Sequence, residues 1–252
     1  MLASRCRVLA AAASGSFLGM SYTHMDEVRA TGFPKVDHAK TKDVAATRWL
    51  KLQTLTYRDQ QGTERAWDVV SRTTKSHSRV AAGVDAVIIL PLLRSKKQQL
   101  VETLLVQQFR PPVDSCTAEL PAGLIDKGET AEEAAVRELK EETGYHGHAS
   151  QVYGPLTMSP GISDETVKLV VLEVDLDRPE NQTPRQDLDE GEFIQVRRIP
   201  LAKLPTELRK LEAQGVMPIT GLYTFALGIE LVEVPSDLQR FRRKFLRFVP
   251  MT

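Results

Sequence analysis

The chain has 252 residues, enough for one domain with a sizeable core and an additional lobe. Its 33 basic side chains balance 33 acidic ones, and 42% of the residues are hydrophobic. Because the net charge is zero, the overall charge does not favour nucleic acid or a membrane surface as the main partner. No apolar stretch is long enough to span a bilayer.

Residues 1–46 are predicted to form an N-terminal extension. Residues 1–25 contain two arginines, several alanines and serines, and no acid, which is typical of a mitochondrial presequence but also of a disordered extension. Cys6 and Cys116 lack metal-binding or redox spacing, which indicates reduced thiols in an intracellular protein. We therefore expect a cytoplasmic or nuclear location, with mitochondria as the alternative.

A small β lobe is predicted for residues 47–78. Trp49–Tyr57 alternates apolar and polar side chains as a strand does, Asp59–Gly62 has turn composition, and Glu64–Thr73 is a returning strand. Residues 79–252 are then expected to form the main domain.

The main domain mixes strands with helices. Its first two predicted strands are strongly apolar, as in a buried sheet. The expected strands are Val84–Leu93, Leu100–Phe109, Gln151–Thr157, Val167–Leu176 and Glu192–Arg197, and the later helices are Leu201–Gln214 and Thr220–Leu231. This mixture predicts an α/β fold, an α/β/α sandwich with a mixed sheet. In the tail, 240–248 is basic with interleaved aromatics, and we expect it to dock on the protein body rather than on nucleic acid or a membrane.

One acidic run carries the chemistry. Thr130–Thr143 is rich in Ala and Glu and ends at Gly144, as a helix does. At about 100° per residue, Glu138, Glu141 and Glu142 fall within roughly a third of the circumference. Clustered carboxylates suit a hard cation such as Mg²⁺ or Mn²⁺, although a solvated acidic helix has the same composition.

The complete pattern decides between these alternatives. Within Gly123–Tyr145, Gly is followed after five residues by Glu, and after seven more by Arg-Glu, an aliphatic residue, one residue, Glu-Glu, one residue and Gly. This is the Nudix box, with every position matched. The chain therefore resembles the Nudix hydrolases, which cleave nucleoside diphosphates linked to another moiety. The resemblance implies the same sandwich fold. Arg137 lies four residues before Glu141 on the predicted helix, so it can pair with that carboxylate.

Features outside the box resemble the eukaryotic ADP-ribose (ADP-sugar) pyrophosphatases. They are Pro160, fifteen residues after Tyr145, and the segments 108–112, 119–123 and 67–74. The resemblance implies Mg²⁺-dependent cleavage of ADP-ribose to AMP and ribose 5-phosphate by a homodimer with swapped N-terminal lobes. Another Nudix specificity and a non-catalytic ADP-ribose-binding module are the alternatives.

The same resemblance implies a set of site residues. Two or three Mg²⁺ ions, or Mn²⁺, are expected on metal ligands Glu138, Glu141, Glu142 and the carbonyl of Ala122. The expected substrate contacts are Trp49 and Trp67 on adenine, with Asp68, Arg72, Arg110, Glu119, Leu124 and Met158 around the rest of the substrate.

The general base is expected on the acidic loop after the box. Glu192 is the first candidate and Glu190 the second, while Glu141 assists from the helix. Two glutamates on such a loop are otherwise solvent-facing side chains. Glu165 is expected as an auxiliary metal ligand.

Overall fold

The computed structural model describes residues 34–73 and 84–231. The expectations for residues 1–25 and for the tail 240–248 lie outside the described residues, so the cellular location stays a prediction. No helix among the described residues is long and apolar enough to cross a membrane.

The chain divides into two compact units. Of the described residues, the first unit comprises 34–45 and Leu52–Val69, and the second comprises Ala46–Lys51, 70–73 and 84–231. The first unit contains most of a three-stranded sheet in the order β1-β2-β3, with β1 at Val36–Ala46, β2 at Leu50–Arg58 and β3 at Glu64–Arg72. Strand β1 lies in the segment that the sequence analysis assigned to the extension, so the sheet starts earlier than the predicted lobe boundary. Its exposed, mostly polar side chains give no alternating apolar signal.

The turn between β2 and β3 is stabilised as its composition predicts. The Asp59 carboxylate accepts hydrogen bonds from the backbone N–H groups of Gln61 and Thr63, each at 2.9 Å. Gly62 supplies the positive φ of 81° that other residues rarely adopt.

The second unit is built on a mixed sheet. Its main path runs β11-β6-β5-β4-β9-β8, while β10 pairs with β5 and β7 pairs with β4. Strand β4 is parallel to β9 and β6 is parallel to β11. The strands are β4 Ala86–Ser95, β5 Gln98–Arg110, β6 Ser115–Glu119, β7 Ala122–Leu124, β8 His148–Thr157, β9 Thr166–Asp175, β10 Gln195–Pro200 and β11 Met217–Pro218.

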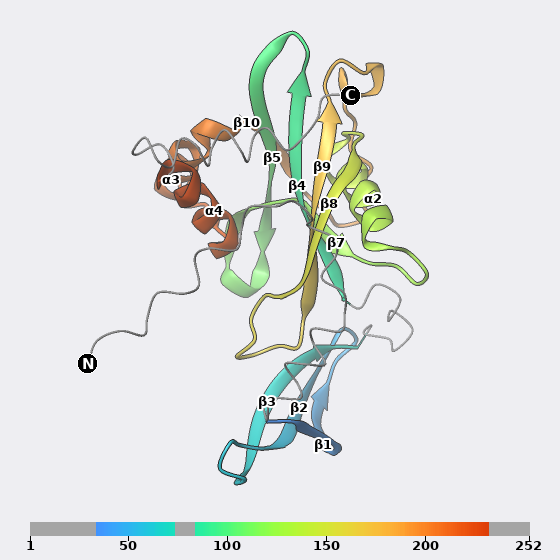
Figure 1. Ribbon diagram of the computed structural model, residues 1–252, viewed down its shortest axis with the longest axis vertical. Coiled ribbons are helices and arrows are strands. Elements are labelled where there is room, and N and C mark those ends of the chain that lie inside the picture. The colour runs from blue at the N-terminus through green and yellow to red at the C-terminus, as the bar shows by residue number, and fades with distance from the viewer. Residues whose placement is uncertain (1–33, 74–83, 232–252) are drawn as a thin grey trace, which may run out of the picture. The chain divides into compact units, whose positions relative to one another are not determined.

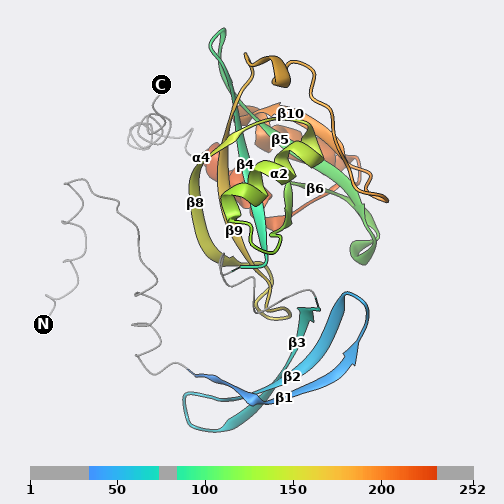
Figure 2. The same cartoon turned by 90° about the vertical axis from the view of Figure 1, so that its right-hand side faces the viewer.

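Helices cover both faces of this sheet (Figures 1 and 2). Successive strand residues point to opposite faces, so the fully buried neighbours Leu104 and Leu105 of β5 enter different cores. Leu104 packs in the cluster that contains Leu139 of α2, and Leu105 packs with Leu208 and Leu222 from α3 and α4. The helices are α2 Ala131–Thr143, α3 Leu204–Ala213 and α4 Thr220–Leu231, with 3₁₀ turns at Pro111–Val113, Pro179–Asn181 and Leu201–Lys203. The predicted α/β/α sandwich is confirmed.

Candidate active site

Helix α2 begins and ends where the sequence predicts. At its start, Thr130 Oγ1 accepts a bond from the Glu133 N–H (3.2 Å) while the Glu133 carboxylate accepts one from the Thr130 N–H (2.8 Å), a capping box. At its end, Gly144 adopts a φ of 74° and donates its N–H to the Lys140 carbonyl at 2.8 Å. A side chain at Gly144 would also meet the Arg185 backbone nitrogen at 2.3 Å.

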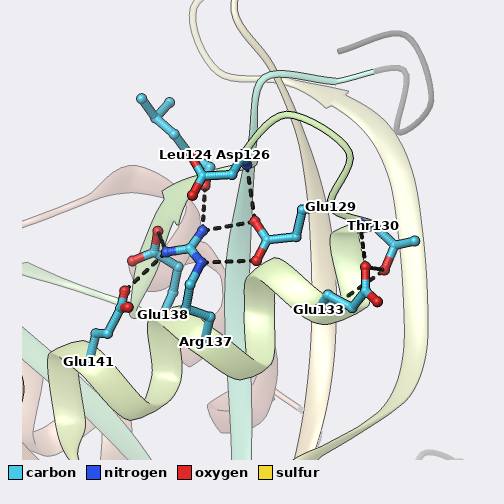
Figure 3. A network of polar contacts seen from close by, with 8 residues as sticks. All are labelled: Leu124, Asp126, Glu129, Thr130, Glu133, Arg137, Glu138 and Glu141. Atoms are coloured by element: carbon cyan, nitrogen blue, oxygen red, sulfur yellow. Dashed lines mark hydrogen bonds and ion pairs between the residues drawn. The ribbon is translucent and has the colours of Figure 1, made fainter. Parts of the chain in front are cut away.

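One guanidinium organises the box (Figure 3). Arg137 donates two hydrogen bonds to Glu129, both 2.9 Å, and one to the Leu124 carbonyl, also 2.9 Å. Its Nη1 reaches Glu138 at 2.8 Å and Glu141 at 3.0 Å, which confirms the expected pair with Glu141. The contacts with Glu129 raise the pKa of Arg137 and lower the pKa of Glu129. Arg137 thereby ties the loop, the end of β7 and the helix together.

The surroundings of Glu142 disfavour its charged form, whereas those of Arg137 favour the charged form of the guanidinium. Glu142 is 6% exposed, and its carboxylate accepts one hydrogen bond, from the Ala122 N–H at 3.1 Å. Burial, with a smaller contribution from the nearby carboxylates of Glu138, Glu192 and Glu119, raises the pKa of Glu142 to about 8, although the hydrogen bond from Ala122 lowers it. Burial likewise raises the pKa of Glu138, with Arg137 opposing. Negative charge is therefore crowded here beyond what Arg137 compensates.

These donors fit a divalent cation chemically, because crowded carboxylates are hard oxygen ligands. Among the residues of the two described ranges, no three His, Cys, Asp or Glu side chains surround a common point as metal ligands. The contacts explain the arrangement: Arg137 engages Glu138 and Glu141, while Glu142 is turned to the Ala122 N–H. The expected ligand roles, including that of the Ala122 carbonyl, stay predictions.

A second arginine lies within electrostatic reach of this cluster. Arg110 forms two hydrogen bonds of 2.8 Å with Glu119, which also accepts one from the Thr117 hydroxyl. Burial opposes ionisation of Glu119, but these bonds outweigh it and lower its pKa. The pair with Glu119, and the charges of Glu142 and Glu192, raise the pKa of Arg110. The structure thus brings together two expected substrate contacts, Arg110 and Glu119, near the box acids.

Arg72 and Glu165 are paired with each other, which the sequence analysis did not foresee. Arg72 reaches Glu165 Oε1 with Nε at 2.8 Å and with Nη2 at 2.7 Å. The backbone of Val70 bonds to Ile162 at 2.8 Å beside this pair. The end of β3 is therefore fixed to the loop between β8 and β9, in which Met158 is 46% exposed.

The two tryptophans are about half exposed, Trp49 at 56% and Trp67 at 49%. The guanidinium carbon of Arg48 lies 4.3 Å from the centroid of the Trp49 ring. Trp67 and Asp68 belong to the first unit and Trp49 to the second. Asp68 accepts a hydrogen bond from the Thr54 hydroxyl at 2.7 Å.

The acidic loop places Glu192 near the box. Glu190 and Glu192 are exposed, but the charge of Glu192 contributes to the raised pKa values of Glu138 and Glu142. The Glu192 carboxylate accepts the Asp189 N–H at 3.2 Å. Sequence reasoning missed Gln186, which connects this loop to α2, because an isolated Gln in a polar segment carries no recognisable signal.

Comparison with known proteins places this geometry in a family. Residues 84–217 match the NUDIX domain. The chain belongs to the Nudix family. It is thus a Nudix hydrolase as predicted, and enzymes of this kind generally depend on a divalent cation.

Several relatives have names that describe an activity. An ADP-ribose pyrophosphatase of Saccharomyces cerevisiae is 41% identical over 77% of this chain and 82% of its own length. An ADP-sugar pyrophosphatase of Mus musculus is 35% identical over 81% of this chain and 90% of its own length. A crystal structure of an ADP compounds hydrolase, 19% identical, covers 86% of this chain and 97% of its own chain with a TM-score of 0.51, which supports the fold.

We predict that Gly123→Ala lowers the hydrolase rate strongly. A Cβ at this position would lie 1.9 Å from the Glu138 carboxyl carbon, so Glu138 has to move. A displacement of about 1 Å at a reacting centre costs up to about 10²-fold in rate. The matched control is Gly221→Ala, whose Cβ meets open space. Equal steady-state rates for the two variants would contradict the importance of the Glu138 position.

We predict that Glu142→Gln stabilises the metal-free protein at alkaline pH while abolishing most activity. The pKa of Glu142 is raised from 4.5 to about 8, so the folded state holds a proton that the unfolded state has lost in this window. Stability of the wild type therefore falls as pH rises from 4.5 towards 8, and Gln removes this loss. Thermal unfolding in chelator at several pH values measures the effect, with exposed Glu132→Gln as control. A variant with unchanged pH dependence would refute it.

Proposed function

We propose that this protein hydrolyses the pyrophosphate bond of ADP-ribose, and of related ADP-sugars, to AMP and the sugar phosphate, with Mg²⁺ as the divalent cation. The observation that carries the proposal is the pair of desolvated carboxylates Glu138 and Glu142, with Arg110 within electrostatic reach of Glu142. The names of the yeast and mouse relatives support the choice of substrate.

The chemistry assigns a role to each group. Glu138, Glu142 and Glu141, with the carbonyl of Ala122, would hold two or three cations, which would neutralise charge on the pyrophosphate and make a bound water more acidic. Because Arg137 already binds Glu138 and Glu141, it holds both carboxylates in a fixed orientation before a cation binds.

Groups outside the box bind and orient the substrate. Arg110 is positioned to bind phosphate oxygens, and its partner Glu119 keeps the guanidinium in place before the substrate arrives. The half-exposed rings of Trp49 and Trp67 offer apolar surfaces for adenine, and Asp68 and Arg72 are polar residues on the same strand as Trp67. Leu124 and Met158 complete the expected contacts.

Glu192 accepts the proton of the attacking water, with Glu190 as the second candidate. The new P–O bond forms to water oxygen, the bridging P–O bond breaks, and its electron pair leaves with the departing phosphate group. In the structure Glu192 accepts the Asp189 N–H, so its carboxylate is ordered in the loop before it is used.

We predict that purified protein with Mg²⁺ forms AMP from ADP-ribose and that Glu192→Gln lowers kcat by about 10²–10⁴-fold, the range for loss of a general base. A panel with ADP-ribose, ADP-glucose and a dinucleoside polyphosphate, assayed for AMP with and without Mg²⁺, measures this. Rapid cleavage of another nucleotide without cleavage of ADP-ribose would overturn the substrate. Tight binding of ADP-ribose without turnover would instead favour a binding module.

We also propose a homodimer with swapped N-terminal lobes. The support is the apolar surface that the strands of the small sheet leave exposed: Val44 is 59%, Leu50 45% and Leu52 36% exposed. Apolar side chains that one chain leaves exposed can be buried against a second subunit.

We predict that Trp67→Ala and Glu142→Gln subunits complement each other. In a swapped dimer, half of a co-refolded 1:1 mixture is heterodimer with one intact site, which restores about a quarter of wild-type activity. Dimers with unswapped lobes contain no intact site. The mass in solution, compared with 28.1 kDa for one chain, reports dimerisation separately. Recovery near zero from a dimeric mixture would refute the swap.

A further inference from the structure

The connection between β9 and β10 is anchored on the last turn of α2. The Asp187 N–H donates to the Glu141 carbonyl at 2.9 Å. The side-chain amide of Gln186 donates to the Glu142 carbonyl at 2.6 Å and to the Ile194 carbonyl at 3.0 Å. One Gln side chain therefore joins the helix to both ends of the loop that carries Glu190 and Glu192.

The backbone carbonyls in the last turn of α2 need hydrogen-bond donors from outside the helix. The last carbonyls of an α-helix have no donor within the helix. In α2 the Lys140 carbonyl is taken by Gly144, and those of Glu141 and Glu142 are taken by Asp187 and Gln186. Glu141 and Glu142, whose carbonyls accept these bonds, are also residues of the Nudix box.

The far end of the loop is fixed by the same amide. Ile194 is 6% exposed and precedes β10, so its carbonyl is a rigid reference point. Between the anchors, the Glu192 N–H bonds to the Asp189 carbonyl at 3.0 Å and closes a turn. The loop from Asp187 to Phe193 therefore has two fixed ends and an internal turn.

We propose that Gln186 is a positioning residue, which sets the loop carrying the proton acceptor in register with the metal-binding turn of α2. The inference rests on the proposed function. A single NH₂ group supplies both donors, so it links two carbonyls in one geometry that an alcohol or thioether cannot reproduce. Gln186 is exposed, and its substitution leaves both hydrophobic clusters intact.

The test replaces Gln186 with methionine, which has similar length and no donor. Gln186→Met lowers kcat for ADP-ribose by about 10²-fold, as expected for a misplaced reacting group. The KM changes little and calorimetric Mn²⁺ affinity is retained, because the substrate contacts and box side chains stay in place. Hydrogen exchange of the amides from Asp187 to Phe193 accelerates in the free protein. Unchanged exchange and an unchanged kcat would overturn the role.

A double-mutant cycle separates positioning from general destabilisation. In the Glu192→Gln background, Gln186→Met has little further effect on kcat, since the group that it positions is already removed. The matched control is Gln182→Met, which removes a side-chain hydrogen bond to the Leu176 carbonyl in the same connection between β9 and β10. This variant is expected to show no coupling to Glu192. If Glu192→Gln retains wild-type rate, the cycle is run with Glu190→Gln in the same loop.

The outcomes are distinguishable. Additive effects of Gln186→Met and the loop glutamate, with an active wild type, overturn the role of Gln186 alone. Absence of AMP formation by the wild type overturns the proposed function itself, while the exchange measurement still decides whether Gln186 holds the loop.

Discussion

The site depends on the network around Arg137. One guanidinium binds Glu129, Glu138, Glu141 and the Leu124 carbonyl, which come from a loop, a helix and the end of a short strand. Such charge-assisted bonds are about twice as strong as neutral ones and are fixed in direction by the planar group. Without them the box acids on one helix face would repel each other. The loop before α2 would also lose its connection to the helix.

The Arg137 network compensates only part of the negative charge of the box acids. Glu142 is buried and its carboxylate accepts the Ala122 N–H rather than a bond from an arginine, and its pKa is raised as a result. A protein selected for stability alone would place an uncharged side chain here. Retaining a buried carboxylate beside Glu138 makes sense where a cation offsets the repulsion, so that lower stability of the metal-free protein accompanies a site prepared for metal.

The sequence predicts the local features well and the distant contacts poorly. Helix α2, its caps and the pair of Arg137 with Glu141 follow from residues a few positions apart, and the sandwich follows from apolar strands alternating with helices. The pair of Arg72 with Glu165 joins residues that are 93 positions apart, so only the folded chain reveals it. Strand β1 was missed because its exposed side chains do not alternate in polarity.

A buried carboxylate is a poor proton acceptor for catalysis, which explains why the candidate base lies outside the crowded face of α2. A carboxylate added to the crowded face of α2 would share the desolvation of Glu142 and hold its proton, whereas a proton acceptor has to take up a proton and release it to solvent. Glu192, the proposed base, lies on an exposed loop. Such a loop has few core contacts to fix it, so its geometry depends on backbone anchors. The bonds from Gln186 and Asp187 to the carbonyls of α2 provide them, which makes an inconspicuous amide part of the catalytic geometry.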